Sequence, residues 1–339
     1  ATGGGGGATG GGGGATGGGG GSFAWVSMSF SPVPGTPTVA REVVGLGRRS
    51  AGDIWVALGD GTVYRAAAGS NLLQLVPGFP APTSSTTHAD LITTADEVLL
   101  ARGRDVFRCV GACAAFSDFV SVFTVPSQSG APRAFCVRGD RVLFTAKPTG
   151  GATSLFESQR SGASLTFTEV SSDLGVDGER CFIDAGGDVL IPSASSVAVS
   201  LSGGGFSTEP VDLQGQPGAR WTSLARAGTA GLMVGGGSGL RFARRMGTGW
   251  VALAPDTSGS LMTIVLPLSA TEFLAGGLLN GGSDSLPTLF TSDGTSLRPV
   301  DPAPPPIEVQ RGFLVGPNEV LFGGPSRSGS TYVVLHGTR

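Results

Sequence analysis

A short pattern recurs along this chain at a nearly constant spacing and limits its fold more than any other feature. The pattern is a turn residue, usually acidic, followed by a run of apolar residues, as in Asp53-Ile54-Trp55-Val56. The first apolar residues of the units are Ile54, Val98, Val142, Val189, Leu232, Phe273 and Val320, at intervals of 44, 44, 47, 43, 41 and 47 residues. Seven units therefore fill the chain after an amino-terminal segment.

Each unit contains apolar runs for four short strands. In the first unit, residues 53–56 are followed by a Gly-rich turn at 59–62 and a second run at 63–65, which predicts a β-hairpin. Another run precedes each repeated pattern, as residues 134–137 do in the third unit. A period in the forties with four strands per unit is typical of a propeller blade, which buries its faces only against neighbouring blades. We therefore predict an all-β, seven-bladed β-propeller.

The two ends of the chain predict how the ring closes. The seventh unit stops soon after residues 332–335 and lacks an outer strand, whereas residues 23–28 form a spare strand before the first unit. We expect this amino-terminal strand to complete the last blade, because closure removes two exposed sheet edges. The predicted domains are a Gly-rich segment at 1–22 and the propeller at 23–339.

The first unit resembles those of a known group of repeat proteins. Its Asp-Ile-Trp-Val run and the following Gly59-Asp60-Gly61-Thr62 turn are similar to degenerate bacterial seven-bladed β-propellers of the Kelch, WD40 and sialidase-repeat type. The resemblance covers about residues 23–339 but is close only from Asp53 to Arg65. It implies the ring fold and no particular subfamily.

Residues 1–21 are three copies of the heptad Ala-Thr-Gly-Gly-Gly-Gly-Gly. Such a segment has almost no side chains to offset the entropy of ordering, so a flexible tether is the first interpretation. The alternative is an extended docking segment that packs against a partner. The tract also resembles the spacer after the lipidated Cys of Gram-negative envelope lipoproteins, which implies a lipid anchor upstream of residue 1. The docking candidates are Gly3, Gly7, Gly10, Gly14, Gly17 and Gly21.

Four cysteines carry information about the compartment. Cys109 and Cys113 are close enough for a short-loop disulfide, and we favour Cys136 with Cys181 as the second bond among three connectivities. These bonds indicate an oxidising, extracytoplasmic location. Free buried thiols are the alternative, whereas a zinc site lacks nearby histidines.

Charge and hydropathy exclude several classes of function. The net charge is −3 and no Lys/Arg-rich run occurs, which argues against nucleic-acid binding. No apolar stretch approaches the roughly 18 residues of a membrane span.

Only 14% of the residues are charged, which is low for a free soluble protein. We infer that protein partners, either further copies or other envelope or extracellular proteins, cover part of the surface, and we expect a bacterial protein of the periplasm, cell surface or medium. A lightly charged, Ser/Thr-rich monomer is an equal alternative.

Residues suited to catalysis are scarce. The chain has one Lys and two His and shows no HExxH, P-loop, EF-hand or nucleophile-elbow pattern. The pairs Arg48-Arg49 and Arg244-Arg245 are interpreted as solvated loop charges. We predict a non-enzymatic binding or scaffolding module without cofactor or metal; the alternative is a channel site that binds or hydrolyses a glycan or small molecule. The candidates for the channel mouth are His88, Asp90, Arg133, Arg180 and Arg220.

Overall fold

A computed structural model gives the structure of this chain. It describes residues 23–30, 42–80, 89–161, 163–174, 180–184, 186–192, 196–200, 205–211, 221–227, 231–236, 241–246, 249–253, 260–269, 271–279, 289–293, 296–316, 318–326 and 332–339.

The described residues form five four-stranded sheets and one eight-stranded sheet. The first four-stranded sheet in chain order contains β6 (Ala89–Thr93), β7 (Glu97–Arg102), β8 (Asp105–Val110) and β9 (Val120–Thr124). The next contains β10 (Ala131–Arg138), β11 (Arg141–Lys147), β12 (Ser154–Ser161) and β13 (Ser164–Ser171). The third contains β14 (Phe182–Ile183), β15 (Val189–Pro192), β16 (Ser196–Ser200) and β17 (Phe206–Pro210). The fourth contains β18 (Trp221–Ala227), β19 (Gly231–Gly236), β20 (Arg241–Met246) and β21 (Gly249–Leu253). The fifth contains β22 (Ser260–Pro267), β23 (Phe273–Leu279), β24 (Leu289–Ser292) and β25 (Leu297–Pro299).

The eight-stranded sheet joins the two ends of the chain. Its order is β2-β3-β4-β5-β1-β28-β27-β26. β1 pairs antiparallel with β28, and its last two residues pair parallel with β5. The bounds are β1 (Ala24–Phe30), β2 (Val43–Arg48), β3 (Ile54–Leu58), β4 (Val63–Ala66), β5 (Leu72–Leu75), β26 (Arg311–Gly316), β27 (Glu319–Pro325) and β28 (Tyr332–Thr338).

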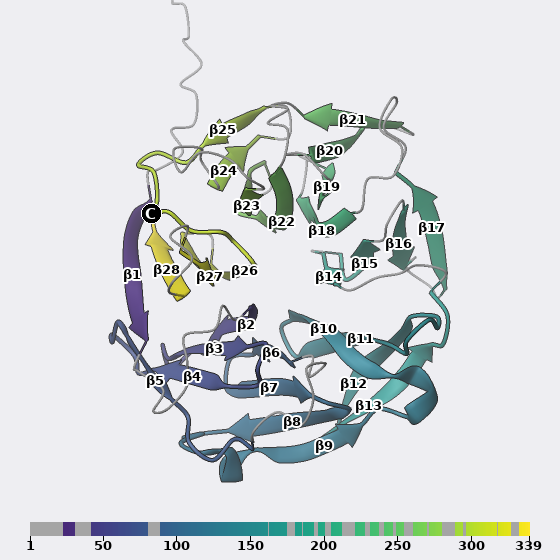
Figure 1. Cartoon of the computed structure of the whole chain (residues 1–339). Helices are drawn as coiled ribbons and strands as arrows, with labels where there is room; N and C mark the ends of the chain where they lie inside the picture. Colours follow the sequence, from purple (N-terminus) through teal and green to yellow (C-terminus); the bar gives the residue numbers. More distant parts are fainter. Residues whose placement is uncertain are drawn as a thin grey trace, which may run out of the picture.

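The sheets are arranged radially around a central axis (Figure 1). The first strand of each four-stranded group lies nearest the axis. The repeated apolar runs all fall on the second strands, which are β3, β7, β11, β15, β19, β23 and β27. Every residue of β3 is buried, because a second strand has neighbouring sheets on both faces. The period seen in the sequence is therefore the period of these doubly buried strands.

Turn chemistry follows the sequence in the first unit. Gly61 has a φ of +83°, and the Asp60 carboxylate accepts the backbone N–H of Thr62 at 2.9 Å. This turn joins β3 to β4, as the Gly-rich pattern predicts. The described helical residues are two short 3-10 turns, Phe116–Asp118 and Ser127–Ser129. No helix in the described ranges is long and apolar enough to cross a membrane.

Candidate functional site

The inner strands line a partly open cavity of about 150 Å³ near the axis of the ring. Each of β2, β6, β10, β14, β18, β22 and β26 contributes to its wall, so seven segments distant in sequence meet there. Most of the lining is apolar, and its titratable side chains are Asp90, Arg180 and Arg311. Among the described lining residues, the cavity therefore combines hydrophobic walls with three charged groups.

Asp90, on β6, is held by backbone donors. Its Oδ1 accepts the N–H of Leu91 at 2.9 Å, and its Oδ2 accepts the N–H of Phe135, on β10, at 2.6 Å. Burial raises the pKa of Asp90 to about 6, although the nearby Arg311 charge and the two backbone donors favour the carboxylate. Asp90 thus ties two neighbouring inner strands together and titrates close to neutral pH.

The two arginines of the cavity are fixed by backbone carbonyls. Arg180 lies just before β14 and donates to the carbonyl oxygens of Thr263 at 2.6 Å and Gln310 at 3.1 Å. Arg311, at the start of β26, donates to the carbonyl oxygens of Val44 at 2.6 Å and Gln310 at 3.1 Å. Both guanidinium groups therefore bind the same carbonyl oxygen of Gln310, which holds two positive charges side by side.

The structure brings together part of the predicted channel set. Asp90 and Arg180 line the cavity, whereas Arg133, on β10, is not among its lining residues. His88 and Arg220 lie outside the described residues. Sequence reasoning missed Arg311, although its place at the start of the seventh inner strand was a usable signal.

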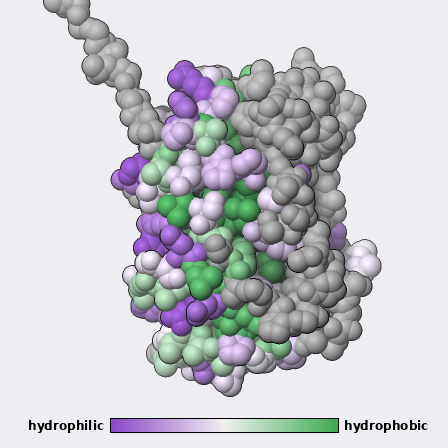
Figure 2. Space-filling view, turned by 60° about the vertical axis from the view of Figure 1, so that its left-hand side comes forward, coloured by the Kyte–Doolittle hydropathy of each residue, from purple (hydrophilic) through white to green (hydrophobic). Residues whose placement is uncertain are grey.

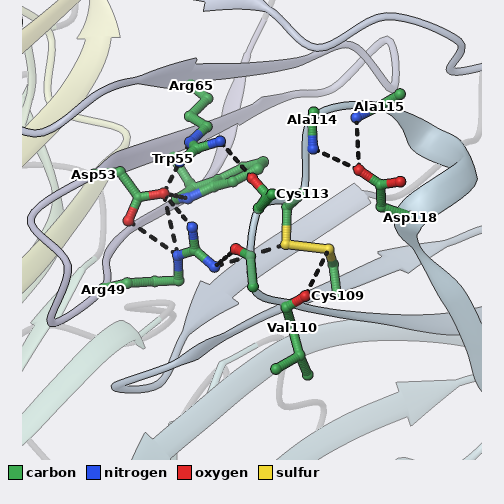
Figure 3. The surroundings of a disulfide bond; sticks show 12 residues. Arg49, Asp53, Trp55, Arg65, Cys109, Val110, Cys113, Ala114, Ala115 and Asp118 are labelled. Carbon is green, nitrogen blue, oxygen red and sulfur yellow. Dashed lines mark hydrogen bonds and ion pairs between the residues drawn. A yellow bond between two sulfur atoms is a disulfide. The ribbon is translucent and has the colours of Figure 1, made fainter.

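A second polar cluster surrounds the short disulfide (Figure 3). Cys109 is bonded to Cys113. Buried Arg49 donates to both carboxylate oxygens of Asp53 and to the carbonyl oxygen of Gly111 at 2.6 Å. The interpretation of Arg49 as a solvated charge is therefore wrong: its guanidinium clamps the disulfide loop onto the first unit.

Asp53 is the centre of this clamp. Besides Arg49, it accepts the indole N–H of Trp55 at 2.8 Å and pairs with Arg65 at 2.9 Å. Burial alone would raise the pKa of Asp53, but the hydrogen bonds from Arg49 and Trp55 and the charges of Arg49 and Arg65 together lower it. The guanidinium groups of Arg49 and Arg65 also lie 5.5 and 5.3 Å from the Trp55 ring centre. The acidic residue and Trp of the repeated pattern thus have a structural role here.

The second disulfide joins two neighbouring sheets. Cys136, on β10, is bonded to Cys181, which precedes β14, and the described cysteines are all paired. These are the two bonds that the sequence analysis favours.

Acidic residues of the repeated pattern also bind arginines of neighbouring units. Glu97 accepts from Arg160 at 2.7 and 2.8 Å, and Glu272 accepts from Arg339 at 2.7 and 2.9 Å. Further pairs of this kind are Asp188 with Arg226 at 3.1 Å and Glu319 with Arg48. The interpretation of Arg48 as a solvated charge is also wrong. In these four units the acidic residue links its unit to a neighbouring one, whereas Asp53 pairs with arginines of its own unit.

The remaining predicted sites receive no structural description. The six glycines proposed for docking, from Gly3 to Gly21, lie outside the described residues. Within the described part of the chain, no group of three or more His, Cys, Asp or Glu side chains is arranged to hold a metal ion.

No protein-family model matches the chain, and no curated protein matches its sequence. Solved structures do resemble it. YCF48 from Cyanidioschyzon merolae has a TM-score of 0.63 at 12% identity, covering 92% of this chain and 98% of that one, and YCF48 also has a solved structure bound to D1 peptide. Virginiamycin B lyase from Staphylococcus aureus, in a catalytically inactive form with quinupristin, has a TM-score of 0.64 at 10% identity, covering 94% and 99%.

The extracellular domain of BT4673 from Bacteroides thetaiotaomicron has a TM-score of 0.59 at 13% identity, covering 91% of this chain and 39% of that one. These similarities include a lyase and a peptide-bound protein, so they bear on the fold alone. Together with the radial four-stranded sheets, they show that the chain has a β-propeller fold.

Proposed function

We propose that residues 23–339 form a single seven-bladed propeller in which β1 closes the ring against β28. The eight-stranded sheet supports this, because β1 pairs with the last strand of the chain and also touches β5 of the first unit. Two four-stranded blades joined through β1 account for its eight strands. Residues 1–22 then precede the ring as a separate segment.

We propose that this ring is a non-enzymatic binding or scaffolding module that works outside the cytoplasm. The observation that carries the proposal is the distribution of charge. Carboxylates such as Glu97 and Asp53 are buried in pairs with arginines, so part of the charge of a lightly charged chain stabilises contacts inside the ring. Only 14% of the residues are charged, and so low a charge favours a partner that covers part of the surface.

The third and outermost strands supply exposed apolar side chains that such a partner would cover. Val110, on β8, is 54% exposed, and Val120, on β9, is 64% exposed. Val26, on β1, is 41% exposed, and Figure 2 shows hydrophobic residues interspersed with hydrophilic ones on the side of the ring turned toward the viewer. The disulfides favour an oxidising compartment. The peptide bound by YCF48 and the extracellular domain of BT4673 are precedents for both parts of the proposal.

Isolation of the protein from its native source tests the partner-binding role. Electron microscopy and cross-linking mass spectrometry should show a larger particle, with cross-links between outer strands and a partner protein. The double variant Val110→Asp and Val120→Asp should release the ring, whereas Ser161→Asp, which adds a charge at another exposed position, should not. Free rings in the wild type would contradict the proposal.

A further inference from the structure

The central cavity contains more positive than negative charge. Its titratable lining residues are Arg180, Arg311 and Asp90, so the described wall carries a net charge of about +1 when Asp90 is ionised and about +2 when it is protonated. Charges in a confined site with apolar walls are poorly screened by solvent. Arg180 and Arg311 are half-buried there, so they would attract an anion more strongly than fully exposed arginines would.

The arginines are held in place by neutral groups. Arg180 and Arg311 each donate at 3.1 Å to the carbonyl oxygen of Gln310, so the two cations lie next to each other. Their mutual repulsion is unfavourable in a site with few charges of the opposite sign. An oxyanion that accepts from the remaining N–H groups of both would relieve this repulsion, and guanidinium groups match the geometry of carboxylate and phosphate oxygens.

Asp90 does not occupy the position of that anion. Its two carboxylate oxygens accept the backbone N–H groups of Leu91 and Phe135, so the side chain is fixed to β6 and β10. The cavity of about 150 Å³ has the volume of about five water molecules, which is enough for a phosphate or a short carboxylate. Prearranged cations and a site of limited volume together select a small anionic group.

We propose that the central cavity binds a small oxyanion, a carboxylate or phosphate group, against Arg180 and Arg311. The apolar wall around these arginines, with Leu224, Ile264 and Phe313, would surround the rest of a short ligand. This inference goes beyond the proposed partner-binding role and does not depend on it, because the cavity is at the axis and the proposed partner surface is at the rim.

Calorimetric titration of the full chain with inorganic phosphate and with acetate tests the site. We expect saturable binding, weakened at least tenfold by Arg311→Gln and by Arg180→Gln. Arg138→Gln, which removes an exposed arginine outside the cavity lining, should bind like the wild type. Circular dichroism and thermal unfolding of each variant identify any loss of fold.

Asp90→Asn provides a test that misfolding cannot imitate. Removal of the negative charge should strengthen binding of the same anions several-fold, because the field of the two arginines is then unopposed.

A short peptide with a free carboxyl terminus, compared with its amidated form, shows whether the bound oxyanion belongs to a chain end or to a free small anion. The proposal is overturned if neither phosphate nor acetate binds, or if their affinities are unchanged in Arg311→Gln and Asp90→Asn.

Discussion

Asp90→Asn should change how the stability of the ring depends on pH. The folded chain holds the pKa of Asp90 at about 6, above its ordinary value of 3.8, so the folded state binds a proton more readily than the unfolded state. The extra stability is fully present below pH 3.8 and is lost as the pH rises through 6. Between pH 4.5 and 7.5, the wild type should lose about 2 kcal/mol of unfolding free energy through this group.

Urea unfolding of both proteins at pH 4.5 and pH 7.5, followed by tryptophan fluorescence, measures this effect. The Asn side chain does not titrate. The unfolding free energy of the Asp90→Asn protein, relative to that of the wild type, should therefore rise by about 2 kcal/mol from the lower to the higher pH. Lost hydrogen bonds to Leu91 and Phe135 add an offset that is the same at both pH values.

Ser223→Ala is the matched control for this experiment. The Ser223 hydroxyl accepts the backbone N–H of Val265 at 2.9 Å and, like Asp90, links neighbouring inner strands. Because the hydroxyl does not titrate in this range, its removal should cost the same at both pH values. An Asp90→Asn difference that is equal at pH 4.5 and 7.5 would refute the reasoning that burial raises the pKa of Asp90.

Two further predictions concern the covalent links and the packing of the inner strands. Replacing both cysteines of the Cys136–Cys181 bond by alanine should cost about 4 kcal/mol of unfolding free energy, because this bond closes a loop between residues 45 positions apart. The same change at Cys109–Cys113 should cost about 2 kcal/mol, because those residues are only 4 positions apart. Urea unfolding measures both, and the reverse order would contradict the chain-entropy argument. Gly45→Ala should cost about 3 kcal/mol, measured in the same way, because a Cβ there would overlap the backbone nitrogen of the neighbouring inner strand.

The control for the glycine variant lies on β26. Gly316→Ala should be nearly neutral, because a Cβ at this position has no heavy atom within 4 Å. Equal losses at Gly45 and Gly316 would show that backbone propensity, and not close packing of inner strands, determines the cost.

The fold could be predicted because its strongest constraint is local and repeated. The apolar runs of β3, β7, β11, β15 and β27 are buried in the structure, so such runs mark the second strand of a unit. The turn at Gly61 and the pairing of β1 with β28 also follow from residues close in sequence or at the chain ends.

The site could be predicted only in part. Arg180 and Arg311 are 131 positions apart, and their meeting depends on how far each inner strand reaches toward the axis. The burial of Arg49 was also hidden, because its partner Asp53 was interpreted only as a turn residue of the repeat. Neither contact can be inferred from the period of the repeated pattern.

The pairs between Glu97 and Arg160 and between Glu272 and Arg339 have a consequence for how such a chain can change in length. In each pair, the carboxylate belongs to one unit and the arginine to another. Deletion or duplication of one unit would therefore separate a carboxylate from its arginine and leave a partly buried charge unneutralised. We expect the number of units to change only together with compensating substitutions in the units on either side.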